Sequence, residues 1–60
     1  MNHGAPLQER LRKALAAACD SRGRLAVAAA LDIALPTIGK ALCGFNVSRV
    51  TREKIRSMYG

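Results

Sequence analysis

Residues 24–44 constrain the fold most, because two short apolar stretches flank a few turn-forming residues there. Residues 24–31 are almost all alanine, leucine and valine, a composition that suits a short helix wedged between two neighbours. Residues 32–35 are expected to form the turn. A third helix is expected up to Cys43 or Gly44, with apolar residues at helical spacing: Leu35, Ile38, Ala41 and Leu42. Pro36 fits the first turn of that helix, where its missing N–H breaks no hydrogen bond.

A first helix is predicted to begin just after Pro6 and to end near Cys19 or Asp20. Its apolar stripe recurs at spacings of three and four: Leu7, Leu11, Ala14, Leu15 and Ala18. Residues 20–23 form a turn-rich cluster, in which Gly23 is expected to take a positive φ. The first and second helices are therefore expected to follow each other at once.

A fourth helix is predicted near the end of the sequence. Gly44 is expected to close the third helix, and Phe45 and Val47 are expected to fill the core from the next loop. Ser48 is predicted to cap the fourth helix, with its hydroxyl accepting from the amide of Thr51. The residues expected on its buried side are Val50, Ile55, Met58 and Tyr59. Those expected on its solvent side are Arg49, Arg52, Lys54 and Arg56.

The chain length limits the size of the core. A protein of 60 residues buries only roughly 60% of the surface that its unfolded chain exposes. We predict a compact all-α fold of four to five helices, with residues 1–60 as a single domain and residues 1–6 as a flexible leader. The leader has neither the charge nor the apolar run of a signal peptide, so a cytoplasmic protein is expected.

The sequence does not favour catalysis. The four acidic residues are spread over different predicted elements, so no carboxylate pair is expected: Glu9, Asp20, Asp32 and Glu53. Cys19 and Cys43 have no adjacent base and lack the spacing of zinc ligands, so both are expected as free thiols among apolar residues. We therefore expect no enzyme activity, no bound metal and no cofactor.

The charge indicates a polyanionic partner. Ten Lys and Arg residues against four Asp and Glu give a formal net charge of +6. Seven of the ten are arginine, whose planar guanidinium matches phosphate and guanine. Such an excess is typical of proteins that bind DNA or RNA. A solubilising surface or an acidic partner remains the alternative.

Residues 25–44 read Leu-Ala-Val-Ala-Ala-Ala-Leu-Asp-Ile-Ala-Leu-Pro-Thr-Ile-Gly-Lys-Ala-Leu-Cys-Gly. This segment resembles the helix-turn-helix of the lambda-repressor-like family, which includes phage repressors and Cro proteins. The family places residues such as Ala28, Ile33 and Ile38 at the helix contact, after the turn and on the inner side of the recognition helix. Residues 37–55 are similar to the lactose-repressor group, in which a Val-Ser-x-x-Thr-Arg-x-x-Val type segment follows the recognition helix.

Three positions depart from the family pattern. Asp32 stands where glycine is usual in the turn, and aspartate tolerates the left-handed conformation better than most residues. Ala34 replaces the serine or threonine that commonly caps the recognition helix, which leaves an amide without its usual partner. Gly39 stands where serine is frequent, and close approach of the backbone to DNA is one reason for it.

The resemblance implies that the third helix enters the major groove of double-stranded DNA while the second crosses the phosphate backbone. The residues that would face the bases are Ala34, Leu35, Pro36, Gly39, Lys40 and Cys43. Those that would contact phosphates are Arg22, Arg24, Thr37, Asn46, Ser48 and Arg49. Lys40 is the one strong hydrogen-bond donor among the residues that would face the bases. Few direct hydrogen bonds to base edges are therefore expected.

The expected function is that of a sequence-specific transcriptional regulator of the Cro or repressor type, associated with the nucleoid of a bacterial or phage-infected cell. We expect a homodimer on half-sites roughly 34 Å apart, with Val50, Met58 and Tyr59 as its candidate interface. No membrane association and no small-molecule ligand are expected. The main alternative is a helix-turn-helix-shaped module that binds a protein, as in antitoxins or anti-regulators. A cationic membrane peptide is disfavoured because it needs one long helix.

Overall fold

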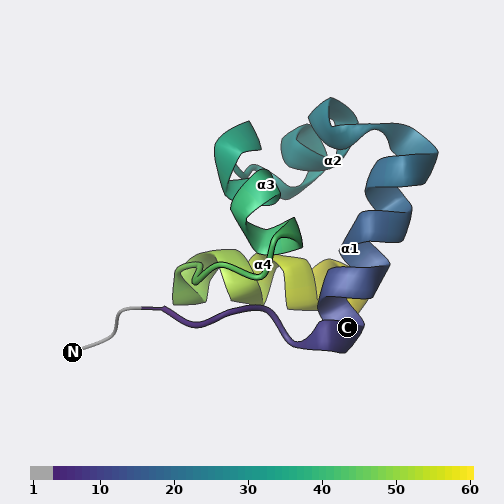
Figure 1. Cartoon of the computed structure of the whole chain (residues 1–60). Coiled ribbons are helices and arrows are strands. Elements are labelled where there is room, and N and C mark those ends of the chain that lie inside the picture. Colours follow the sequence, from purple (N-terminus) through teal and green to yellow (C-terminus); the bar gives the residue numbers. More distant parts are fainter. Residues whose placement is uncertain (1–3) are drawn as a thin grey trace.

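The computed structural model describes residues 4–60 and contains four helices there. These are α1 (Glu9–Arg22), α2 (Arg24–Leu31), α3 (Leu35–Leu42) and α4 (Arg49–Tyr59). Within the described residues the only β pairing is an isolated antiparallel bridge between Ala5 and Val47. Figure 1 shows α4 at the lower end of the molecule beside the first half of α1, while α2 connects α1 to α3 at the top. The predicted all-α class is therefore confirmed.

The segment before α1 is more ordered than expected. Ala5 exchanges two backbone hydrogen bonds with Val47, of 3.1 and 3.0 Å. The Arg52 guanidinium donates to the Val47 carbonyl at 2.8 Å and approaches the Ala5 carbonyl at 3.5 Å. Residues 1–3 of the expected flexible leader lie outside the described part, but from Ala5 onward the prediction is wrong. Because this pairing keeps the backbone extended, α1 begins at Glu9 and not directly after Pro6.

The end of α1 also lies later than predicted. Residues 20–22 continue the helix, and its last residue is Arg22. Gly23 follows with a φ of 91° and donates its amide to the Cys19 carbonyl at 2.8 Å. The positive φ predicted for Gly23 is confirmed, and this single residue is enough to separate α1 from α2.

The turn between α2 and α3 is a Schellman motif. Asp32 adopts the left-handed conformation, with a φ of 56° and a ψ of 49°. Its amide donates to the Ala29 carbonyl at 3.3 Å, and the Ile33 amide donates to the Ala28 carbonyl at 3.0 Å. This pair of bonds satisfies carbonyls that a helix end otherwise leaves free. The expected left-handed aspartate is therefore present.

The same motif ends α3. Gly44 has a φ of 84° and donates to the Ala41 carbonyl, while the Phe45 amide donates to the Lys40 carbonyl at 3.0 Å. Gly44 thus closes the helix as predicted. Phe45, however, is 62% exposed and does not fill the core. Val47, whose backbone pairs with Ala5, occupies the buried position alone.

Helix α4 begins at the predicted cap. The Ser48 hydroxyl accepts from the Thr51 amide at 3.2 Å. Ile55 is fully buried and Tyr59 is half-buried one turn later, but Val50 is 65% and Met58 48% exposed. Residues 55 and 59 share one helical face, whereas residue 50 is turned away from it. The predicted burial of Val50 and Met58 is therefore wrong.

The core is wholly apolar and small. Its ten buried residues come from the segment before α1, all four helices and the loop before α4: Leu7, Leu11, Leu15, Val27, Ala28, Leu31, Ile38, Ala41, Val47 and Ile55. Among the described residues no polar or charged residue is buried. Helix α2 packs against α1, α3 and α4 through one face, and its other residues, Leu25, Ala26, Ala29 and Ala30, are exposed. It therefore lies between neighbouring helices as predicted, but only one of its faces is covered.

Replacing Asp32 by glycine should stabilise the fold by about 1 kcal/mol, because an L-residue pays for the left-handed conformation and glycine does not. The Asp32 carboxylate also stands at the negative end of α2, which is unfavourable. Urea unfolding of both proteins measures the difference. Gly44→Ala, at a φ of 84°, is the opposite control and should destabilise by about 1 kcal/mol. Equal stability of all three proteins would contradict this account of the two turns.

Candidate nucleic-acid interface

Helices α2 and α3 form an angular pair with an open outer side. They are bent by 106° relative to each other, and residues 32–34 connect them. Ile38 and Ala41 of α3 point inward and are fully buried. Since a helix has a period of 3.6 residues, the residues between them are directed outward. The α3 outer face is uncovered by any other described element.

All six residues predicted to face the bases lie on or beside the α3 outer face. Five of them are exposed: Ala34, Leu35, Pro36, Lys40 and Cys43. Gly39 is half-buried. The structure therefore brings this set together on one surface. Its chemistry is apolar apart from the Lys40 ammonium and the Cys43 thiol.

The residues predicted to contact phosphates fall into two groups. Arg22 and Arg24 flank Gly23 at the corner of α1 and α2, where both are exposed and neither has an ion pair within the described chain. No side chain caps α2, and the amides of residues 24–26 have no acceptor among residues 4–60. Two guanidinium groups and the positive end of a helix thus coincide at this corner.

The second group surrounds the start of α4, and some of its polar groups already form hydrogen bonds within the protein. Asn46 is exposed in the loop. The Ser48 hydroxyl caps α4 and lies 3.0 Å from the Thr51 hydroxyl. The Nε of Arg49 donates to Glu53 at 3.1 Å, although both side chains remain largely exposed. Thr37 belongs to neither group, since it lies in the first turn of α3, where it is half-buried. Around the start of α4, Asn46 is therefore the exposed residue whose side chain is not engaged in a hydrogen bond with another described residue.

The start of α3 has unsatisfied amides, as expected. Ala34 provides no side-chain cap, as predicted. However, the Thr37 amide donates to the Ala34 carbonyl at 3.0 Å, and the Ile38 amide donates to the same carbonyl at 3.2 Å. Pro36 has no amide hydrogen. The amides of Ala34 and Leu35 are left without an acceptor among the described residues.

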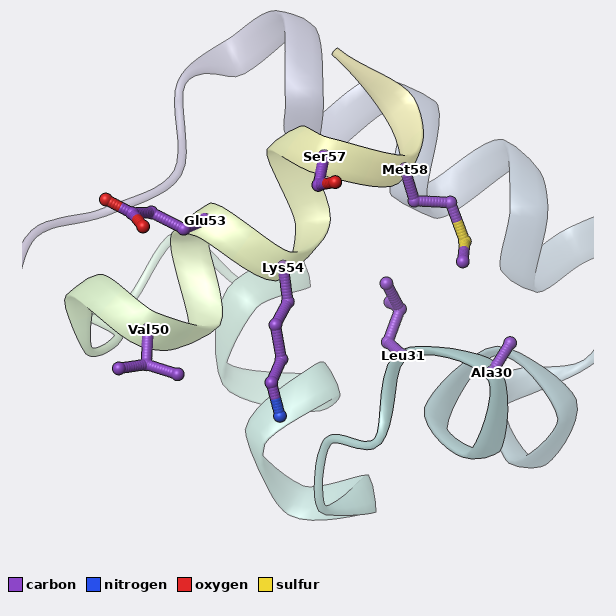
Figure 2. Close-up of a pocket in the computed structure, with 7 residues that line it drawn as sticks. All are labelled: Ala30, Leu31, Val50, Glu53, Lys54, Ser57 and Met58. Carbon is purple, nitrogen blue, oxygen red and sulfur yellow. The ribbon is translucent and has the colours of Figure 1, made fainter.

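Lys54 has a structural role that the sequence analysis missed. Its ammonium group donates to the Asp32 backbone carbonyl at 2.9 Å and lies 3.8 Å from the Asp32 carboxylate. Lys54 is half-buried, so the predicted solvent position is wrong. Figure 2 shows its side chain reaching from α4 to the turn after α2. Helix α2 has no basic residue in its last turn, and Lys54 supplies that charge from another helix. The α2–α3 turn is thereby tied to α4.

An apolar groove lies beside this contact, between α2 and α4. Its apolar walls are Ala30, Leu31, Val50 and Met58. In Figure 2, Leu31 and Met58 lie on opposite sides of the groove, and Glu53 is turned away from it. Of the three residues predicted for a dimer interface, Val50 and Met58 line this groove. Tyr59 instead packs against the core, and its buried hydroxyl has no hydrogen-bond partner within the described residues.

The two thiols are free, as expected. Partial burial raises the pKa of the Cys19 thiol; the Arg24 charge lowers it and the Asp20 charge raises it, both less strongly. Among residues 4–60 no group of three metal-binding side chains is found. No single helix there has the length and apolarity to cross a membrane; α2 and α3 would meet that test only jointly, despite their 106° bend.

Comparisons of this chain with protein-family models, with curated proteins and with solved structures find no match. The functional assignment therefore depends on the residues and geometry described above.

Proposed function

We propose that this protein is a sequence-specific double-stranded DNA-binding transcriptional regulator of the lambda-repressor-like helix-turn-helix type. The observation that carries the proposal is the α2–α3 pair: two short helices bent by 106° around a left-handed turn, with the outer face of the second helix uncovered. Helix-turn-helix units have interhelical angles of about 90–120° and a turn of three or four residues. The core positions Ala28 and Ile38, buried in this pair, are those that the family resemblance assigns to it.

The charge distribution supports the same proposal. With α3 in the major groove, Lys40 faces the bases, and the corner formed by Arg22 and Arg24 meets the phosphate backbone beside it. Asn46 follows α3 and would contact the backbone on the other side. Phosphate contacts from these groups would supply most of the affinity, and Lys40 with the apolar contacts of Leu35 and Pro36 would supply base discrimination.

We propose that the regulator acts as a homodimer. One recognition helix reads only a short half-site, and a two-fold dimer would place two such helices about 34 Å apart. The groove formed by Leu31, Val50 and Met58 is the candidate interface, because it is the apolar surface left open between α2 and α4. Analytical ultracentrifugation with and without an operator duplex tests this part. A strict monomer in both states would remove it.

A second candidate function is a protein-interaction module. The specific observation in its favour is the apolar character of the α3 outer face, where Leu35 is 40% exposed, and of Phe45 beside it. DNA-binding surfaces are usually polar and strongly basic. An apolar surface with one lysine suits a protein partner as well as thymine methyl groups.

Selection of bound sequences from a random duplex library distinguishes these candidates. A regulator should enrich a palindromic motif, and its affinity should fall steeply as salt rises. Salt-dependent binding with no enriched motif would mean non-specific DNA binding and would contradict the regulator proposal. Absence of duplex binding would favour the protein-interaction module.

The variant Gly39→Ala distinguishes the effect of this residue on stability from its effect on DNA binding. An added Cβ would meet no protein atom within 4 Å, so the variant should be about 1 kcal/mol more stable because alanine is the better helix former. If the Gly39 backbone lies close to DNA, the same variant should bind the selected duplex more weakly. Urea unfolding and a binding titration on one preparation measure both effects. Lower stability would contradict the first expectation, and unchanged affinity would exclude close approach as the reason for this glycine.

A further inference from the structure

A second pocket, which we call the arginine pocket, lies between the start of α1 and one face of α4. Its volume is about 470 Å³, within the range of about 300–1,000 Å³ that is usual for small-molecule sites. None of its lining residues belongs to α2 or α3. It is therefore separate from the α3 outer face, and Arg49 is the one lining residue that was predicted to contact DNA.

Four guanidinium groups line the arginine pocket against one carboxylate. Arg49, Arg52 and Arg56 follow each other along α4 at spacings of three and four, which places them on one helical face. Arg10 comes from the first turn of α1, and Glu53 is the single acidic residue of the lining. Like charges at such spacings repel one another, so a bound anion would stabilise this arrangement.

Most of the hydrogen-bonding capacity of these guanidinium groups is unused. Arg49 donates to Glu53 through its Nε alone, and Arg52 uses one terminal nitrogen for the Val47 carbonyl. The side chains of Arg10 and Arg56 form no hydrogen bond or ion pair with any described residue. Each guanidinium carries five N–H donors in a planar fork. Unsatisfied donors therefore come from both walls of the pocket, one on α1 and one on α4.

The start of α1 adds to the positive potential. Gln8, which also lines the pocket, precedes the helix without a side-chain cap. The amides of residues 9–11 have no acceptor among the described residues. Free amides at the beginning of a 14-residue helix favour negative charge nearby. This effect supports the guanidinium cluster and does not replace it.

The geometry points to a binding site for a small anion with two or more linked phosphate groups. Guanidinium groups bind phosphate oxygens in pairs, with charge-assisted hydrogen bonds. The three arginines of α4 extend over two helical turns, or roughly 10 Å, which is more than one phosphate group spans. A ligand with linked phosphates reaches Arg10 and Arg56 at one end and Arg49 and Arg52 at the other. This inference does not depend on the proposed DNA binding.

Titration with sodium pyrophosphate at constant ionic strength, followed by amide chemical shifts, tests the site without DNA. Amides of residues 8–11 and 49–56 should shift saturably, while those of residues 35–43 should not. The double variant Arg10→Gln, Arg56→Gln should lose at least about tenfold in affinity, since each lost guanidinium removes charge-assisted hydrogen bonds. The matched double variant Arg22→Gln, Arg24→Gln removes the same charge at the α1–α2 corner and should bind pyrophosphate within about twofold of the natural chain.

For two further variants, the proposal predicts the direction in which the affinity for pyrophosphate changes. Glu53→Gln removes the one carboxylate of the pocket and should tighten pyrophosphate binding, whereas Asp20→Asn, near the other end of α1, should not. Arg56→Lys keeps the charge but loses the planar fork, so weaker binding by this variant supports phosphate recognition even if the double variant fails to fold. Equal losses in the two double variants would mean diffuse charge attraction and would overturn the proposal. Displacement of pyrophosphate by duplex DNA, together with an equal loss of DNA affinity in Arg10→Gln, Arg56→Gln, would assign the pocket to DNA contact and overturn it as well.

Discussion

Leu15→Ala should leave most of the protein unfolded in water at room temperature. Leu15 lies in the middle of α1, is fully buried and belongs to the core shared by all four helices. Truncating a buried leucine to alanine costs about 2–5 kcal/mol, whereas a core in a domain of this size rarely supplies more than about 3–5 kcal/mol. The loss therefore equals most of the available stability. Far-UV circular dichroism and urea unfolding measure it.

Leu25→Ala is the matched control, because it is the same substitution on a helix of the same fold. Leu25 is 74% exposed on the uncovered side of α2, so little apolar surface returns to water when it is truncated. The expected change in stability is less than about 0.5 kcal/mol. If both variants lose stability equally, the outer side of α2 is buried in solution, and α2 is covered by another molecule.

The contrast between Leu15 and Leu25 shows that the burial of a side chain does not always follow from the local sequence pattern. Turns and caps follow from single residues that act locally, and for that reason Gly23, Asp32, Gly44 and Ser48 could be placed correctly, whereas both ends of α1 lie later than predicted. The burial of Ile38 also follows from helical periodicity within one short segment. A leucine in an apolar run gives no such local signal, so α2 was expected to be covered on two sides.

Long-range contacts explain the other differences. Lys54 and Asp32 are 22 residues apart, and Arg52 approaches a carbonyl 47 residues away in the sequence. On the helical pattern of α4 alone both cations belong to the solvent side. Their contacts require the turn after α2 and the segment before α1 to be present beside α4. The same applies to Val50 and Met58, whose exposure depends on what the other helices leave uncovered.

The sequence predicted which candidate DNA-binding residues share one surface. It did not predict which of their polar groups are already engaged within the protein. Periodicity around Ile38 placed Lys40, Pro36 and Cys43 on the outer side of one helix, and the structure has them there. Arg49 and Ser48 are exposed, but their polar groups are already engaged with Glu53 and Thr51. Side-chain hydrogen bonds of this kind compete with a ligand, and a list of residues does not reveal them.

Lys40→Glu should abolish specific DNA binding if α3 is the recognition helix. Lys40 is exposed on the α3 outer face and has no ion pair within the described chain, so its replacement leaves the core and the turns untouched. The variant would remove the one strong donor of this face and place a carboxylate against acceptors and phosphates. Like-charge contacts across an interface cost several kcal/mol, so the affinity for the selected duplex should fall by at least about 100-fold.

Lys13→Glu is the matched control for this prediction, because it makes the same change of charge on the exposed side of α1. Non-specific attraction depends on net charge and is weakened by both variants alike, whereas groove contact depends on position. A fluorescence-anisotropy titration at two salt concentrations should therefore show a loss for Lys40→Glu that greatly exceeds the loss for Lys13→Glu. Each variant should lower the stability by less than about 1 kcal/mol, because Lys40 lies in the last turn of α3 and Lys13 pairs with Glu9. Equal losses would mean that α3 does not enter the groove, and the exposed apolar residues Leu35 and Phe45 would then mark a surface for a protein partner.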